Sequence, residues 1–302
     1  MTLSLKHLLA AGLAVFGLQQ AQAALNVVTC EPEWASLAKE LGGDKLNVSS
    51  ATTALQDPHR IEARPSLIAR VRNADLLVCT GMELEVGWLP VLVQQSGNGK
   101  LAAGSPNLFE AGRFITPIEV PTRLDRGDGD VHAAGNPHIQ QDPRNIALVA
   151  KALSARLAQI DPPNAAFYQD KQTAFATRWA DAMQKWEQRA APLKGVTLVA
   201  HHKNMGYLEN WLGMKEVATL EPKPGVEPSA GHLSELNAQL ARQPAKMVVR
   251  AAYQDPRASQ WLSEHAHIPA VALPFTVGGN DKATDLFSLF DNTLTLLLEA
   301  AK

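Results

Sequence analysis

Short apolar runs alternate with segments of helical periodicity along the chain after residue 23. In the first half the runs are LNVVTC (25–30), KLNVSSAT (45–52), ADLLVCTG (74–81) and KLAAGSP (100–106). The second half repeats the theme with GVTLVAHHK (195–203), EVATLEPK (216–223), AKMVVRAAY (245–253) and AVALPFTV (270–277). Valine- and leucine-rich runs that alternate with helices are typical of βα units in a mostly parallel sheet. The pattern predicts an α/β protein with two Rossmann-like lobes, over residues 24–163 and 192–302.

The segment between the two lobes, residues 164–191, contains neither glycine nor proline. Tyr168, Phe175, Trp179, Met183 and Trp186 recur there at helical spacing, which predicts one continuous helix with an aromatic face packed on the core. Such a helix would be about 40 Å long at 1.5 Å per residue. We expect a rigid strut that joins the lobes and limits their movement.

The first 23 residues, MTLSLKHLLAAGLAVFGLQQAQA, have the architecture of a secretory signal peptide. Lys6 precedes an apolar run that is too short to span a bilayer comfortably, and the segment ends in Ala-Gln-Ala. We expect cleavage near Ala24 and a soluble periplasmic protein, with an uncleaved membrane anchor as the alternative.

Composition excludes one class of partner and leaves the cysteines open. The chain has 302 residues, is 46% hydrophobic and carries a formal net charge of -2, so it offers no basic surplus for nucleic acid. We expect a monomer. Cys30 and Cys79 each end an apolar run; they form a disulfide if those strands are neighbours, and otherwise stay as buried thiols.

Several histidines follow predicted strands, where ligands bind in open α/β sheets. His59 follows the second run, His138 lies near the end of the first lobe, and His201 and His202 directly follow a run of the second lobe. Asp281 comes shortly after the last run. Three imidazoles and one oxygen make the tetrahedral set that Zn²⁺ prefers. A metal site in the cleft between the lobes is therefore predicted.

Five ordered motifs give the chain a strong resemblance to the metal-specific solute-binding proteins of bacterial ABC importers, the high-affinity zinc and manganese uptake family. The motifs are DPHRIEARPS (57–66), NADLLVCTGMELEVGWLP (73–90), GNPHIQQDP (135–143), HKNMGYLENWLG (202–213) and LEPKPGVEPSAGHLSEL (220–236). The resemblance implies two lobes joined by one long helix. Because such a helix limits lobe movement, we expect modest closure on the metal. The resemblance also implies a permease partner in the inner membrane, at which ATP is hydrolysed on the cytoplasmic side.

The resemblance implies His59, His138 and His202 as ligands. His202 is chosen over His201 because the family ligand lies four residues before a Gly-Tyr pair, and adjacent strand-end side chains point oppositely. Many relatives supply an acidic fourth ligand where this chain has Thr276 or Val277. We therefore expect Asp281 to complete the shell from the following loop, with water or a backbone-held oxygen as the alternative. His132, with Asp128 and Asp130, lies in the approach to the site as a transient metal ligand or a turn-stabilising residue.

The predicted function is capture of Zn²⁺ for import, because a nitrogen-rich site favours zinc over manganese. Manganese or another divalent metal is the alternative within the same family, and a metal-dependent adhesin on the same scaffold is another. A three-histidine zinc hydrolase is the rival from a different class, since an open fourth position also suits catalysis. We expect no enzyme, because the chain has no HExxH pair or GxSxG elbow.

Overall fold

The protein is described from a computed structural model that covers residues 23–125, 127 and 129–302. Residues 1–22 of the predicted signal peptide, and Asp128 of the predicted metal approach, lie outside the described residues. None of the helices within residues 23–125, 127 and 129–302 combines the length and the apolar composition of a membrane-spanning segment.

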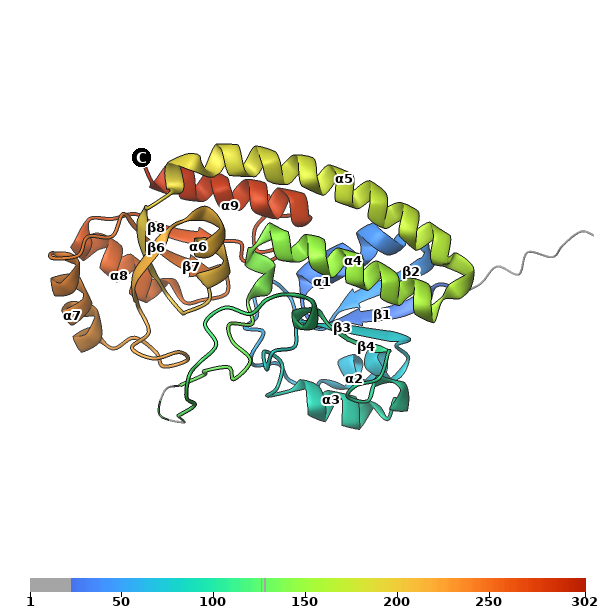
Figure 1. Cartoon of the computed structure of the whole chain (residues 1–302). Coiled ribbons are helices and arrows are strands. Elements are labelled where there is room, and N and C mark those ends of the chain that lie inside the picture. Colours follow the sequence, from blue (N-terminus) through green and yellow to red (C-terminus); the bar gives the residue numbers. More distant parts are fainter. Residues whose placement is uncertain (1–22, 126, 128) are drawn as a thin grey trace, which may run out of the picture.

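Two four-stranded parallel sheets form the centres of the two lobes (Figure 1). The first sheet has the order β2-β1-β3-β4 and the second the order β6-β5-β7-β8. The strands are β1 (Leu25–Thr29), β2 (Leu46–Ser50), β3 (Leu76–Cys79), β4 (Leu108–Glu110), β5 (Thr197–Ala200), β6 (Lys215–Thr219), β7 (Met247–Ala251) and β8 (Ala270–Leu273). The same order in both sheets means that each lobe repeats the same doubly wound topology.

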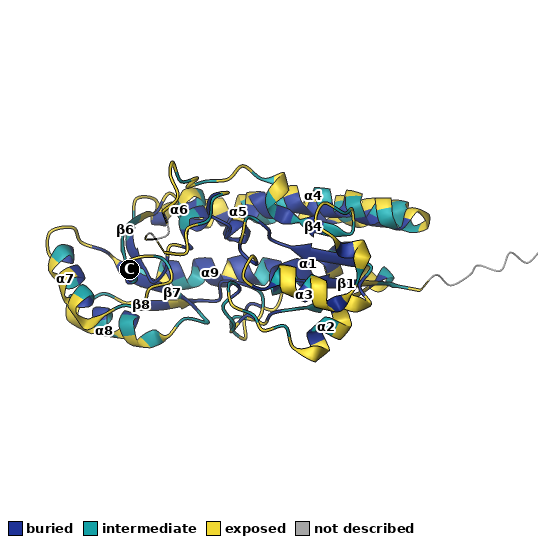
Figure 2. Ribbon diagram, turned by 90° about the horizontal axis from the view of Figure 1, so that it is seen from below, coloured by how far each residue is buried: buried dark blue, intermediate teal, exposed yellow. Residues whose placement is uncertain are grey.

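Helices cover both sheets, so the inner strands β1, β3, β5 and β7 are mostly buried while the outer faces of the helices are exposed (Figure 2). They are α1 (Pro32–Gly42), α2 (Pro65–Arg72), α3 (Leu89–Ser96), α4 (Pro143–Ile160), α5 (Ala165–Ala190), α6 (Gly206–Leu212), α7 (Ala230–Leu240), α8 (Pro256–Ala266) and α9 (Leu286–Ala300). The α/β class and the two lobes predicted from the hydrophobic pattern are confirmed.

The predicted strand over 100–106 is wrong. The chain forms a 3-10 turn at Gly99–Leu101 instead, because the Asn98 side chain accepts a hydrogen bond from the Lys100 amide. Gly104 then takes a positive φ of 80° and Pro106 follows, so the backbone reaches extended geometry only at β4.

The long helix α5 runs along both lobes with α9 beside it (Figure 1). Its aromatic face is buried, and one continuous apolar core extends from the first sheet to the second. The indole of Trp179 donates to the Pro143 carbonyl at the start of α4, and that of Trp186 donates to Asp291 on α9. Indole hydrogen bonds to elements of both lobes therefore add to apolar burial in holding this helix in place.

Cys30 and Cys79 form a disulfide. They follow β1 and end β3, and these strands pair with Thr29 opposite Val78, so the two Cα atoms lie 4.7 Å apart. The open question of the cysteines is thus resolved by strand adjacency, which the sequence alone does not reveal.

Candidate metal centre

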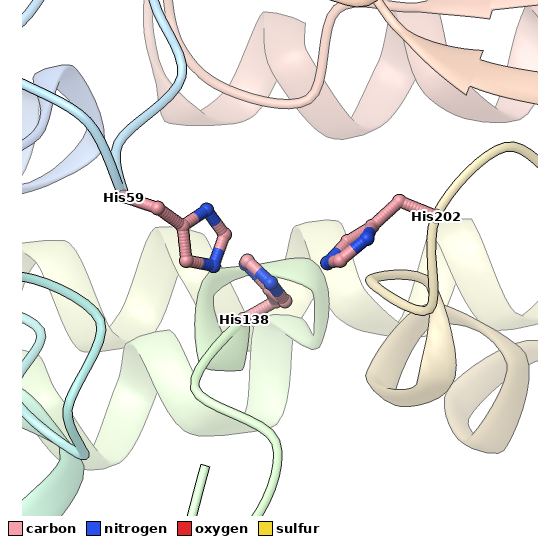
Figure 3. A group of neighbouring side chains, drawn as sticks. All are labelled: His59, His138 and His202. Carbon is pink, nitrogen blue, oxygen red and sulfur yellow. The ribbon is translucent and has the colours of Figure 1, made fainter. Parts of the chain in front are cut away.

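Three histidines from distant parts of the chain meet between the lobes (Figure 3). His59 comes from the loop after β2, His138 from the segment before α4 and His202 from the loop after β5. One ring nitrogen of each lies within 4.8 Å of the others, and ring centroids are 5.3–6.0 Å apart. Two nitrogens that each bond one zinc ion at about 2.0–2.1 Å lie at most about 4 Å apart, so the spacing within this group is close to that of nitrogens sharing an ion.

Asp57 orients the His59 ring. The Oδ1 atom of Asp57 lies 2.7 Å from Nδ1 of His59 and also accepts a hydrogen bond from the His59 amide. Burial raises the pKa of the Asp57 carboxyl, but these hydrogen bonds outweigh it and the pKa is lowered overall. An ionised carboxylate only accepts, so Nδ1 carries the proton and Nε2 keeps its lone pair. That Nε2 atom is buried without a hydrogen-bond partner among the described residues.

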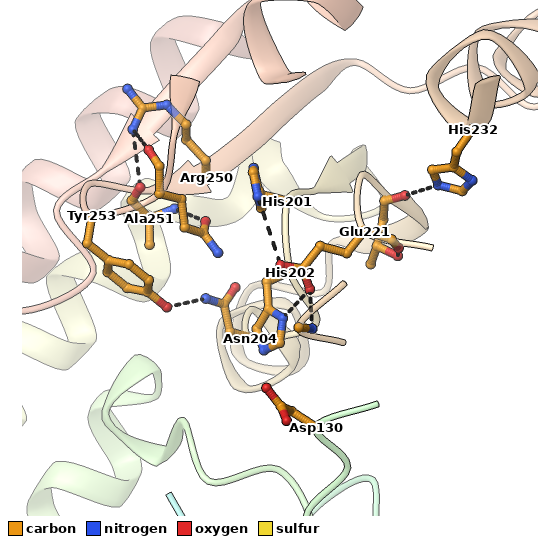
Figure 4. A network of polar contacts seen from close by, with 12 residues as sticks. Asp130, His201, His202, Asn204, Glu221, His232, Arg250, Ala251 and Tyr253 are labelled. Atoms are coloured by element: carbon orange, nitrogen blue, oxygen red, sulfur yellow. Dashed lines mark hydrogen bonds and ion pairs between the residues drawn. The ribbon is translucent and has the colours of Figure 1, made fainter. Parts of the chain in front are cut away.

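Glu221, which follows β6, holds His202 in the same way (Figure 4). Its Oε2 atom lies 2.6 Å from Nδ1 of His202 and accepts a hydrogen bond from the Gly225 amide at 2.8 Å. His201 lies on the other side of the strand end, with Nε2 4.0 Å from Glu221, and is not a member of the three-histidine group. The structure therefore brings His202 into the group and leaves His201 outside it.

His138 has no polar partner for its ring. It is 1% exposed, and neither ring nitrogen forms a hydrogen bond within the described part of the chain. Burial, and then the neighbouring His59 and His202, lower the pKa of His138 well below its usual value. A buried imidazole that makes no hydrogen bond is costly unless something binds it. The ring is therefore neutral and has a lone pair available to a metal ion.

Asp281, the predicted fourth ligand, is not brought to the histidines. The turn that carries it is closed by a hydrogen bond from the Gly278 amide to the Ala283 carbonyl, and Asn280 ties it to Asn292 of α9. This leaves the Asp281 side chain exposed and outside the three-histidine group. Thr276, one of the two residues expected at the place of the acidic ligand, donates its hydroxyl to Glu33.

His132 lies against the group. Its ring stacks on that of His59 with centroids 5.4 Å apart. Burial and then the neighbouring His59 lower the pKa of His132 to about 4. Asp130 of the same segment is half exposed and pairs with Arg60 at 3.5 Å.

Reasoning from sequence missed the two orienting carboxylates. The signal for Asp57 was its position two residues before His59, and the signal for Glu221 was its position at the end of a strand in the same sheet as β5. Each was visible as an acid near a predicted strand end. Only the folded loops show that they meet an imidazole.

The fold and this site define a class: a two-lobed α/β protein with a nitrogen-rich site for a divalent cation in the cleft between its lobes. Residues 27–300 match the family model described as "Zinc-uptake complex component A periplasmic". The chain belongs to this family, which consists of substrate-binding components of metal importers and is not an enzyme family.

Two curated relatives agree with this assignment, and a solved structure shares the fold. The chain is 28% identical over 229 residues to the zinc-binding lipoprotein AdcA of Streptococcus pneumoniae, covering 72% of this chain but only 43% of AdcA. It is 24% identical over 257 residues to the manganese ABC transporter substrate-binding lipoprotein PsaA of the same species, covering 83% and 80% of the two chains. A crystal structure of ZnuA superposes with a TM-score of 0.77 at 21% identity, covering 92% of this chain and all of the other.

Proposed function

We propose that this protein captures Zn²⁺ between its lobes and delivers it to an ABC-type permease. The observation that carries the proposal is that carboxylates fix Nδ1 of both His59 and His202, while Nε2 of each is left for a metal. Metal-binding histidines characteristically donate their second ring nitrogen to a carboxylate or carbonyl, which sets the tautomer and raises ligand basicity. A buried His138 with two unpartnered nitrogens completes a set of three ligands.

The ligand chemistry favours zinc over manganese. Manganese sites are rich in carboxylate and water oxygens, whereas imidazole suits zinc and its neighbours in the Irving–Williams order. The two carboxylates that contact these imidazoles, Asp57 and Glu221, each accept from a ring nitrogen. The three-histidine group therefore offers the ion nitrogen ligands. Because the relative PsaA is named as a substrate-binding lipoprotein of a manganese ABC transporter, Mn²⁺ is the alternative ion for the same transport function.

Catalysis is not part of this function. A zinc hydrolase needs a base beside the metal-bound water. The two carboxylates that orient the imidazoles, Asp57 and Glu221, already accept from them. We expect the zinc-loaded protein to leave an activated ester intact at the rate of a zinc-free control.

The setting of this function is the periplasm. We propose that residues 1–23 direct export and are removed, and that the mature protein works there as a monomer whose lobes, residues 24–163 and 192–302, are joined by the helix at 164–191. The partner is a permease of the inner membrane. The family's role as the substrate-binding component of metal importers supports this.

Zinc titration of single-ligand variants tests the proposal. His59→Ala, His138→Ala and His202→Ala should each lower zinc affinity by orders of magnitude in competition with a chelator, while circular dichroism shows the fold intact. His201→Ala is the matched control, because it removes a neighbouring imidazole that lies outside the group. Unchanged affinity in all three ligand variants would refute the proposal.

A further inference from the structure

A fourth imidazole, that of His132, lies next to the three-histidine group. The ring of His132 stacks on that of His59 with an interplanar angle of 24°, and its Nε2 atom is buried without a hydrogen-bond partner in the described residues. His132, His138 and His202 line one and the same cavity. A buried nitrogen left without a partner beside an incomplete ligand set points to a ligand role.

Hydrogen bonds from backbone amides hold the segment that carries His132 to both lobes. The Ala133 amide donates to Oε2 of Glu83 in the first lobe at 2.6 Å. The Asp130 amide donates to the Pro224 carbonyl in the second lobe at 2.9 Å. Gly129, with φ of 86°, permits this approach, because a Cβ there would lie 2.2 Å from the same carbonyl oxygen. These anchors hold the imidazole beside the site at little further entropic cost.

We propose that His132 is the fourth protein ligand of the bound metal, in the place predicted for Asp281. This rests on the proposed function, since it completes the shell of the same ion. His132 lies just outside the group whose ligand atoms are within 4.8 Å of one another, so its ring turns inward from its stacked position when the ion is present. The shell then contains four imidazole nitrogens and no carboxylate.

Such a shell makes His132 a determinant of metal selectivity. Each imidazole that replaces an oxygen ligand strengthens binding of zinc more than that of manganese. Loss of His132 should therefore lower the affinity for Zn²⁺ more than that for Mn²⁺. It should also leave a water or buffer ligand in the fourth position.

The test compares His132→Ala with two other variants of the same region. Val131→Ala alters the exposed neighbour and keeps the imidazole. Glu83→Gln weakens the anchor of the segment and also keeps it. Zinc and manganese dissociation constants are measured for each protein, together with the visible spectrum of the Co²⁺ form, which reports the ligands around the ion directly.

We expect His132→Ala to shift the cobalt spectrum and to lower zinc affinity at least as much as the loss of a group that only orients a ligand, which is on the order of 10–100-fold. Val131→Ala should match the wild type in both measurements, and Glu83→Gln should keep the wild-type cobalt spectrum at saturation. An unchanged affinity in His132→Ala overturns the assignment, and so does a weaker affinity with an unchanged spectrum. In either case zinc binding that still depends on His59, His138 and His202 leaves the proposed function standing.

Discussion

Nδ1 of His202 lies 2.6 Å from Oε2 of Glu221, and this contact joins the strand ends of β5 and β6 at the metal site. Glu221→Gln should therefore lower zinc affinity by about 10–100-fold, because the amide no longer fixes the tautomer or raises the basicity of His202. A chelator-competition titration measures the change. Glu227→Gln is the control, since this exposed acid lines the same cavity and should leave the affinity as it is. Equal affinities for the two variants would contradict the orienting role.

The His138 side chain suits metal binding but lowers the stability of the metal-free protein. Leucine has a similar size and does not place two buried nitrogens without partners in the core. We expect His138→Leu to abolish tight zinc binding and to raise the free energy of unfolding of the metal-free protein by about 1 kcal/mol or more, the scale of an unsatisfied buried polar group. Urea unfolding with a chelator present measures this. A decrease in this free energy of about 2 kcal/mol or more would instead show that the ring makes stabilising packing contacts.

Much of the architecture followed from sequence, and the reason differs between elements. Strands such as β1 and β7, and the long helix α5, have hydrophobic periodicity that is decided within the element itself. The contacts of Asp57 and Glu221 with imidazole depend on how two loops fold against their histidines, and periodicity carries no information about that. The position of Asp281 depends on the turn held by Asn280, which is again a property of side-chain contacts.

Glu33 gives the stability of the protein a dependence on pH. It is buried at the start of α1, where burial raises its pKa to about 7, although Thr276 donates a hydrogen bond to it. Because the folded pKa is above the ordinary value of 4.5, this group stabilises the fold fully below that value. The contribution is lost as the pH rises through about 7.

Glu33→Gln removes this titration and keeps an acceptor for Thr276. The variant should therefore gain stability relative to the wild type as the pH rises from 5 to 8, by up to about 3 kcal/mol. Thermal unfolding across that range measures the difference. The exposed Glu264→Gln serves as the control and should follow the wild type. A constant difference between Glu33→Gln and the wild type would contradict the prediction.

The disulfide stabilises the first lobe and lies outside the three-histidine group. It joins residues 49 apart in sequence. Removing it increases the conformational entropy of the unfolded chain, so the double variant Cys30→Ala/Cys79→Ala should lose about 4 kcal/mol of unfolding free energy. Denaturant unfolding measures the loss. Zinc affinity should stay at the wild-type value, since neither cysteine belongs to the three-histidine group. A large loss of affinity would mean that the loops after β1 and β3 also set the site.

An anomalous difference map at the zinc edge, from crystals grown with one equivalent of zinc, tests the central claim most directly. We expect a single peak between the lobes, bonded at about 2.0–2.1 Å to Nε2 of His59 and His202 and to a ring nitrogen of His138. A peak elsewhere on the protein, with these three nitrogens unbound, would contradict it.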